Sequence, residues 1–151
     1  SPDEPEMIER LGMITQDAHH LDCPVLGMIY PRGENLDIMD GDTTSAAAHA
    51  ARLAFELGCD VVKTKWTGSI DSFKRVTSAV PIPVLIAGGP AGSSTEEILT
   101  TVFQAMQAGG GGVCMGRQVF SHESPSKMVT ALRAIVHDGA DVKQAMEIAG
   151  L

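Results

Sequence analysis

The stretch Asp60-Val61-Val62-Lys63-Thr64-Lys65 decides the fold of this chain. It follows Gly58, which ends a segment whose apolar residues recur with helical spacing. The stretch itself is a short apolar run that becomes polar at its far end. A strand of a parallel sheet has this composition because both of its faces are covered. We therefore predict a parallel strand over residues 60–65.

The same change from helical to strand-like spacing recurs along the chain. Short apolar runs predict further strands at residues 23–30, 82–87 and 112–115. Helical spacing predicts helices at residues 1–22, 43–57, 70–79, 95–108, 124–137 and 140–149. Thr43 or Thr44 is the expected N-cap of the second helix. One helix followed by four strand–helix units implies an α/β fold with a parallel sheet, and residues 1–151 as one structural unit.

The composition is that of a folded, acidic protein. The 151 residues carry a formal net charge of -8 and are 44% hydrophobic, which disfavours both disorder and nucleic-acid binding. No apolar run reaches transmembrane length, and the acidic start is unlike a signal peptide, so we expect no membrane partner. A complete TIM barrel needs about 200 residues or more, so this chain is too short for one.

Three cysteines, Cys23, Cys59 and Cys114, are widely spaced. They form no CxxC pair and no cluster with histidine, so the sequence predicts neither a disulfide framework nor a zinc site. Free thiols fit a reducing compartment, and we therefore expect a cytoplasmic protein.

Polar residues follow each predicted strand. In parallel α/β folds the active site lies at the C-terminal ends of the strands. The residues at these ends are Tyr30-Pro31-Arg32-Gly33, Lys63-Thr64-Lys65, Ala87-Gly88-Gly89-Pro90 and Met115-Gly116-Arg117. We expect them to converge at one edge of the sheet.

Lys63 is the first candidate for chemistry. Alternation along the strand places Val61 and Lys63 on one side, and in a barrel one side is the interior. Desolvation there, together with the second cation at Lys65, would favour the neutral amine, which attacks a carbonyl to form an imine. The alternative is a strand-end lysine that extends into solvent.

Two other signals accompany this lysine. Tyr30 is the single tyrosine, and at a strand end its phenol could move a proton of a substrate hydroxyl, although it could equally be a packing residue. Gly88-Gly89 and Gly116-Arg117 combine a close backbone approach with a bidentate cation, which suits a phosphate. The alternative for these residues is turn formation and a surface ion pair.

Four segments in this order resemble motifs of the archaeal-type class I aldolase family, and the resemblance extends over essentially the whole chain. They are Met28-Ile29-Tyr30-Pro31-Arg32-Gly33, Val62-Lys63-Thr64-Lys65-Trp66-Thr67-Gly68 with Ile70-Asp71-Ser72-Phe73, Ile86-Ala87-Gly88-Gly89-Pro90, and Met115-Gly116-Arg117-Gln118-Val119-Phe120. The family fold is a TIM (β/α)₈ barrel. The resemblance implies that this chain supplies about the last four strand–helix units of that barrel, β5 to β8, with a preceding helix.

The resemblance implies a role for each candidate. Lys63 would form the Schiff base and Tyr30 would be the proton donor, with Pro31 and Arg32 lining the site. Phosphate would be held by Gly88, Gly89, Gly116 and Arg117. The family uses no metal, and the resemblance implies no other cofactor.

The implied activity is aldol or transaldol carbon–carbon bond chemistry on a phosphorylated keto-sugar. The Thr-Gly-x-Ile-Asp-Ser-Phe continuation and Ala87 resemble the family's 2-amino-3,7-dideoxy-D-threo-hept-6-ulosonate synthases, which serve aromatic amino-acid biosynthesis. Class I fructose-bisphosphate aldolase is the alternative enzyme, and Trp66 and Ala91 depart from residues usual in the family. An inactive half-barrel or a non-catalytic phosphosugar-binding module is the alternative of another class.

The shortness of the chain has a consequence for assembly. The family's acidic proton acceptor near the first strand has no counterpart here. Half of a barrel would also expose a sheet edge and an apolar layer. We therefore expect either a fragment of a longer protein or a half-barrel that pairs with another copy as a homo-oligomer.

Overall fold

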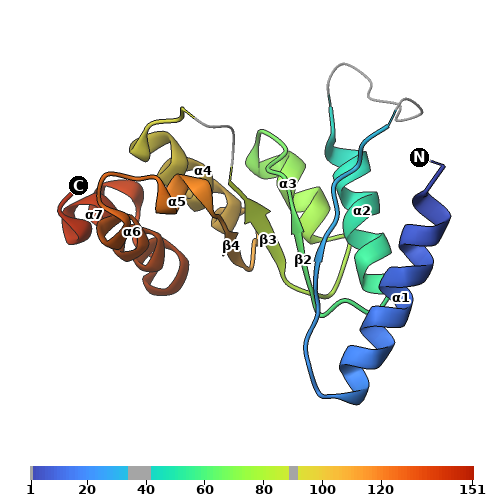
Figure 1. Cartoon of the computed structure of the whole chain (residues 1–151). Coiled ribbons are helices and arrows are strands. Elements are labelled where there is room, and N and C mark those ends of the chain that lie inside the picture. The colour runs from blue at the N-terminus through green and yellow to red at the C-terminus, as the bar shows by residue number, and fades with distance from the viewer. Residues whose placement is uncertain (1, 34–41, 89–91) are drawn as a thin grey trace.

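The computed structural model describes residues 2–33, 42–88 and 92–151. Within these residues the strands are β1 Leu26–Met28, β2 Val61–Thr64, β3 Val84–Ala87 and β4 Gly112–Cys114. The helices are α1 Glu4–His20, α2 Thr44–Glu56, α3 Ile70–Thr77, α4 Thr95–Gln107, α5 Arg117–Phe120, α6 Pro125–Asp138 and α7 Val142–Ala149. Figure 1 shows these elements following one another across the molecule, from α1 at one end to α6 and α7 at the other.

The strands form one parallel sheet in the order β1-β2-β3-β4. Met28 pairs with Lys63, Lys63 with Leu85, and Leu85 with Gly112, so the register is continuous across the sheet. When each crossover is right-handed and each strand adds beside the last, the helices all lie on the same face. This arrangement is a segment of a (β/α)₈ barrel, and it confirms the predicted α/β class.

The core lies between the sheet and the helices on this covered face. Val62, Thr64 and Ile86 are 0% exposed and point toward the helices. They pack with buried side chains of α2, α3, α4 and α6, among them Ala51, Phe73, Leu99 and Met128. Aromatic residues make up only 4% of the sequence, and small aliphatic side chains fill most of this layer in their place.

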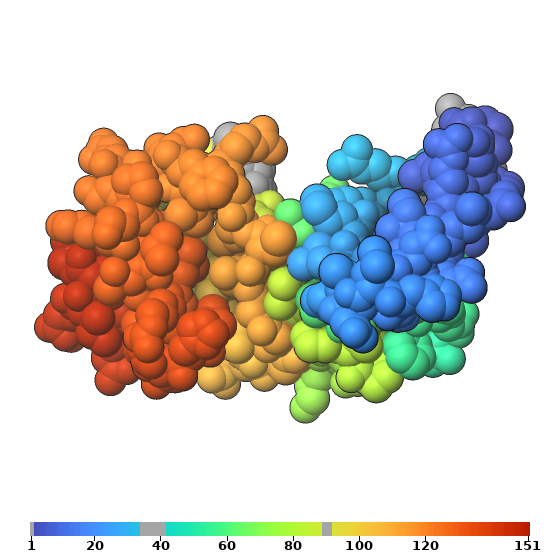
Figure 2. Space-filling view, turned by 60° about the horizontal axis from the view of Figure 1, so that its bottom comes forward, coloured from blue at the N-terminus to red at the C-terminus, as the bar shows by residue number. Residues whose placement is uncertain are grey.

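The opposite face of the sheet is left uncovered by the described part of the chain. Leu26 and Met28 on β1 point to this face and are 39% and 57% exposed. Figure 2 shows the surface set back between the blue N-terminal segments and the orange C-terminal segments. In a closed barrel this face would be the packed interior. We call it the open face of the sheet.

Gly27 shows how tightly the covered face is packed. A Cβ atom at this position would lie 2.8 Å from the Cys59 sulfur and 3.4 Å from the Cβ of Ala54 in α2. Only glycine therefore allows β1 to approach the second helix this closely. The same burial raises the pKa of the Cys59 thiol, with a smaller contribution from the charge of Asp60.

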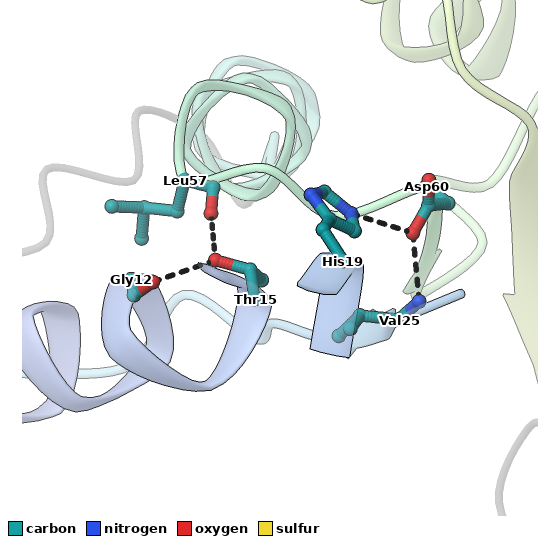
Figure 3. Close-up of polar contacts among 6 residues, drawn as sticks. All are labelled: Gly12, Thr15, His19, Val25, Leu57 and Asp60. Atoms are coloured by element: carbon teal, nitrogen blue, oxygen red, sulfur yellow. Dashed lines mark hydrogen bonds and ion pairs between the residues drawn. The ribbon is translucent and has the colours of Figure 1, made fainter. Parts of the chain in front are cut away.

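Two polar contacts attach α1 to the rest of the molecule (Figure 3). The buried Thr15 hydroxyl lies 2.6 Å from the Leu57 carbonyl oxygen at the end of α2 and 2.9 Å from the carbonyl oxygen of Gly12. His19 Nε2 lies 3.2 Å from the Asp60 carboxylate, which also accepts the backbone N–H of Val25 at 2.7 Å. These contacts hold the beginnings of β1 and β2 together at the edge opposite the candidate site.

Some local predictions are corrected by the structure. Thr43 is the N-cap of α2, as predicted, but its side chain makes no cap bond, and the Asp42 carboxylate accepts the Thr44 N–H at 2.8 Å instead. β1 is shorter than predicted because the Val25 N–H bonds the Asp60 side chain and not a neighbouring strand. The short helix α5 was not predicted. None of the described helices is long and apolar enough to cross a membrane.

Candidate active site

Strand β2 places Lys63 on the open face. Its neighbours Val62 and Thr64 are both 0% exposed on the covered face, so alternation turns Lys63 the other way. Lys63 is half-buried between Met28 of β1 and Leu85 of β3, the residues paired with it in the ladder. An amine held above apolar neighbours at a strand end has the position that the sequence predicted.

Tyr30 lies beside two cations just beyond the end of β1. The Lys65 Nζ atom is 6.0 Å from the centroid of the Tyr30 ring, and the Arg32 Cζ atom is 5.9 Å from the same centroid. Cations at this range are attracted to an aromatic ring. Pro31, between Tyr30 and Arg32, is half-buried. The structure thus joins the ends of β1 and β2 in one cluster of polar side chains.

The ends of β3 and β4 are also in contact. A Cβ atom at Gly88 would lie only 2.6 Å from Oε1 of Gln118 and 3.7 Å from Cγ of Met115. Gly116 and Arg117 are exposed, and Arg117 is the first residue of α5. The predicted phosphate residues of the two strand ends therefore lie near each other. The prediction for Gly89 falls outside the described residues.

A cleft of ≈ 460 Å³ opens between these strand ends and α4. Its lining includes Lys65, Trp66, Gly88, Glu97 and Gln118. Glu97 is already engaged there, since the backbone N–H of Ser94 and then the Ser94 hydroxyl lower the pKa of its carboxyl group. Lys63 is not among the residues that line this cleft.

The loop after β2 packs against and hydrogen-bonds to α3. The Trp66 and Phe73 rings pack with centroids 5.2 Å apart, and Phe73 is fully buried in α3. Ser69 caps α3 in a reciprocal capping box with Ser72, whose hydroxyl also lies 2.8 Å from that of Thr67. The segment that follows Lys63 is therefore fixed by both packing and hydrogen bonds.

These groups together suit a carbonyl substrate that carries an anionic group. Lys63 carries an amine, Tyr30 a phenol hydroxyl, and the strand ends at Gly88 and Gly116 bear backbone groups and the Arg117 cation. Among the described residues no group of three or more histidine, cysteine or acidic side chains is placed to hold a metal ion.

Sequence reasoning missed two features of this site. Gln118 was quoted only as part of a motif, yet its side chain meets Gly88 across the strand ends. The sequence indicated Lys65 only as a second cation near Lys63, whereas its Nζ atom lies 6.0 Å from the centroid of the Tyr30 ring and its side chain lines the cleft. The period of two along β2 already placed Lys65 on the open face and could have indicated its contact with Tyr30.

Comparison with known proteins identifies the family. A family model described as DeoC/LacD family aldolase matches residues 1–122. The chain is 46% identical over 152 residues to 2-amino-3,7-dideoxy-D-threo-hept-6-ulosonate synthase of Halobacterium salinarum, covering 100% of this chain and 56% of that relative. It is 38% identical to synthase 1 of Archaeoglobus fulgidus, covering 99% of this chain and 54% of that protein. The chain thus spans about half the length of the curated relatives it matches.

Solved structures give the same result. An archaeal fructose 1,6-bisphosphate aldolase superposes with a TM-score of 0.82 at 35% identity, over 90% of this chain and 54% of that chain. A second structure, whose subject is the Schiff base forming fructose-1,6-bisphosphate aldolase, has a TM-score of 0.81 at 34% identity, over 89% of this chain and 53% of that one. A fructose-bisphosphate aldolase from Slackia heliotrinireducens, at 24% identity and a TM-score of 0.88 over 99% of this chain and 50% of its own, supports the fold.

Proposed function

Because the chain belongs to the DeoC/LacD aldolase family, we propose that it carries the imine-forming lysine of a class I aldolase or transaldolase acting on a phosphorylated keto-sugar. The observation that carries this proposal is the position of Lys63, at the end of β2 on the open face and next to the strand ends that bear Tyr30 and Gly88. The chain contributes the last four strand–helix units of the barrel, β5 to β8.

The proposed chemistry needs three groups. The Lys63 amine attacks the substrate carbonyl, water leaves, and the resulting iminium accepts the electron pair when the C3–C4 bond breaks. Tyr30 takes the proton of the C4 hydroxyl when the bond breaks, and it is the proton donor to the same oxygen when the reverse steps form the bond. Gly88, Gly89, Gly116 and Arg117 hold the phosphate, so that the carbonyl lies opposite the lysine.

The proposed reaction within the family is that of 2-amino-3,7-dideoxy-D-threo-hept-6-ulosonate synthase. The 46% identity to the Halobacterium salinarum relative supports it, as do Ala87 and the Ile70-Asp71-Ser72-Phe73 continuation. The donor would then be a deoxy-ketohexose 1-phosphate and the acceptor aspartate semialdehyde. Fructose-bisphosphate cleavage is the second candidate, supported by the TM-score of 0.82 to the archaeal aldolase.

The proposed active site needs a cover for the open face of the sheet. Leu26 and Met28 are 39% and 57% exposed where a closed barrel would bury them. Covering this face would also exclude water from the Lys63 amine. We propose that the working site forms when further strands cover the face, either from a longer chain or from a second copy in a homo-oligomer, in the cytoplasm.

Trapping with borohydride tests the assignment of Lys63. We expect reduction in the presence of fructose 1,6-bisphosphate or a deoxy-ketohexose 1-phosphate to leave a covalent adduct on Lys63, located by peptide mass spectrometry. Lys63→Met should lose the adduct, whereas the matched control Lys65→Met, two residues along the same face, should retain it. The sugar that traps faster distinguishes the two candidate reactions.

Other results of this experiment would contradict the proposal. An adduct on Lys65 alone would assign the wrong lysine. Phosphosugar binding that is unchanged in Lys63→Met, without any adduct in the parent protein, would indicate a non-catalytic binding module. Absence of both binding and adduct would indicate an inactive half-barrel.

A further inference from the structure

We propose that His122 is a positioning residue, which fastens the segment carrying Gly116 and Arg117 to the first turn of α4. Its link joins the outer ends of the two loops assigned to phosphate binding, one after β3 and one after β4. The effect on phosphate affinity rests on the proposed function, whereas the link itself does not.

The hydrogen bonds of His122 fix the direction of its ring. Its Nε2 atom lies 2.8 Å from the Thr95 hydroxyl oxygen, and its Nδ1 atom lies 3.0 Å from the backbone nitrogen of Ser124. A backbone N–H can only donate, so Nδ1 accepts and carries no proton. The ring proton is therefore on Nε2, which donates to the Thr95 hydroxyl. Each nitrogen of this half-buried ring has one partner, and the two partners come from different segments.

Thr95 is the first residue of α4, the helix that receives the chain from the loop after Gly88. His122 follows α5, whose first residue is Arg117. The bond between Thr95 and His122 consequently joins the start of α4 to the segment that follows α5. It fixes the end of α5 relative to the start of α4.

Helix α5 needs such an attachment because it is a single turn. It spans only Arg117–Phe120 and has no side-chain cap. A helix of one turn does not hold its shape alone, since nucleation costs more than so few hydrogen bonds return. Burial of Val119, which is 6% exposed, anchors one side. His122, whose own N–H bonds the Val119 carbonyl oxygen at 3.2 Å, anchors the end.

A second contact between the loops lies nearer the site. The close approach of Gly88 to the Gln118 side chain joins them at their inner ends. One contact leaves two segments free to pivot, but two separated contacts set their relative orientation. His122 supplies the second point, and we infer that it sets the spacing between Gly88 and Arg117. The simpler alternative is a loop histidine that contributes to stability alone.

Variants of the two partners separate these readings. His122→Gln retains a donor near the position of Nε2, whereas His122→Asn retains an acceptor near the position of Nδ1. Thr95→Val removes the other partner of the link. Thr130→Val in α6 is the matched control, because its hydroxyl bonds only the Ser126 carbonyl oxygen of the same helix.

Amide hydrogen exchange tests the link directly. The amides of Val119, Phe120 and Ser121 bond carbonyl oxygens of Gly116 and Arg117, so they report on α5. We expect them to exchange about fivefold faster in His122→Asn and in Thr95→Val, with no further increase in the double variant, and slower in His122→Gln than in His122→Asn. Exchange in the core of α6 should not change. Equal exchange in all variants, or acceleration throughout the molecule, would overturn the proposal.

Ligand affinity tests the functional consequence with the same proteins. The half-saturating concentration of inorganic phosphate, followed by the shifts of the amide resonances, should rise about fivefold in His122→Asn and Thr95→Val and stay constant in Thr130→Val. Faster exchange with unchanged phosphate affinity would overturn the assigned effect on phosphate. If the parent protein binds no phosphate, the phosphate-binding role assigned to these loops fails, and the exchange measurement still decides whether His122 links the loops.

Discussion

Lys63 and Thr64 are neighbours in the chain with opposite surroundings. Lys63 lies half-buried on the open face, whereas Thr64 is 0% exposed beneath the helices. Successive side chains of a strand point to opposite faces of the sheet, and here the helices cover only the face of Thr64. The burial of Thr64 thereby fixes the direction in which the Lys63 side chain leaves the sheet.

The buried hydroxyl of Thr64 leads to a stability prediction. Among the described residues it has no hydrogen-bond partner. A buried hydroxyl without a partner costs about 1–3 kcal/mol, and a methyl group of the same shape carries no such cost. We expect Thr64→Val to raise the free energy of unfolding by about 1 kcal/mol in urea denaturation. A decrease would show that the hydroxyl is bonded in solution.

At the scale of elements, α1 is held by polar contacts at its C-terminal half and leaves much of its surface exposed. Met7 and Ile14 on this helix and Leu21 at its C-cap are 65%, 57% and 74% exposed. The clasp of His19, Asp60 and the Val25 N–H, seen in Figure 3, orders the entry into β1 and β2. α1 is therefore attached by the hydrogen bonds of Thr15 and His19 and by the packing of Leu11 against the core.

The clasp predicts a dependence of stability on pH. Two hydrogen bonds lower the pKa of Asp60 in the folded chain below its ordinary value of 3.8. The bond from the Val25 N–H contributes most, and the bond from His19 contributes next. A depressed folded pKa stabilises the fold above the unfolded value and loses that contribution as the pH falls through the folded value. We expect the parent protein to be more stable than Asp60→Asn at pH 6, with the difference shrinking below about pH 4.

Urea denaturation at several pH values measures this difference. Glu9→Gln, which removes a carboxylate from an exposed position of α1, is the control for net charge. A difference between parent and Asp60→Asn that does not change between pH 6 and pH 3 would contradict the role assigned to the Asp60 charge.

Helix α5 shows where element prediction from sequence ends. Residues 117–120 are too few for an apolar period to be read, and no capping residue precedes them. The turn forms because Val119 is drawn into the core and His122 reaches Thr95. Long helices and buried strands were predicted because their pattern repeats within the element itself.

At the scale of the whole molecule, the sheet has one covered and one open face. Surfaces that expose contiguous apolar side chains associate with other molecules or bind apolar dyes. Met28, on the edge strand β1 and paired with Lys63, is 57% exposed on this face. Lys63 therefore lies on the face of the sheet that the described residues leave uncovered.

This geometry predicts the effect of a charge on the open face. Met28→Glu should lower both the fluorescence of the apolar dye ANS and the apparent mass at high protein concentration in analytical ultracentrifugation. Ile148→Glu is the matched control, because Ile148 is 62% exposed on α7, away from the sheet. Equal effects of the two substitutions would show that the open face is not the surface through which molecules meet.

By itself the sequence determined the order of strands and helices, the parallel sheet and the strand ends that bear Lys63, Tyr30, Gly88 and Arg117, because period and turn residues are local properties of a chain. The tertiary structure decided which of these side chains meet. It brought Lys65 to Tyr30, Gln118 to Gly88 and His122 to Thr95. Such contacts join residues up to 35 positions apart, as between Lys65 and Tyr30, and only the register of the sheet and the packing of the helices determine them.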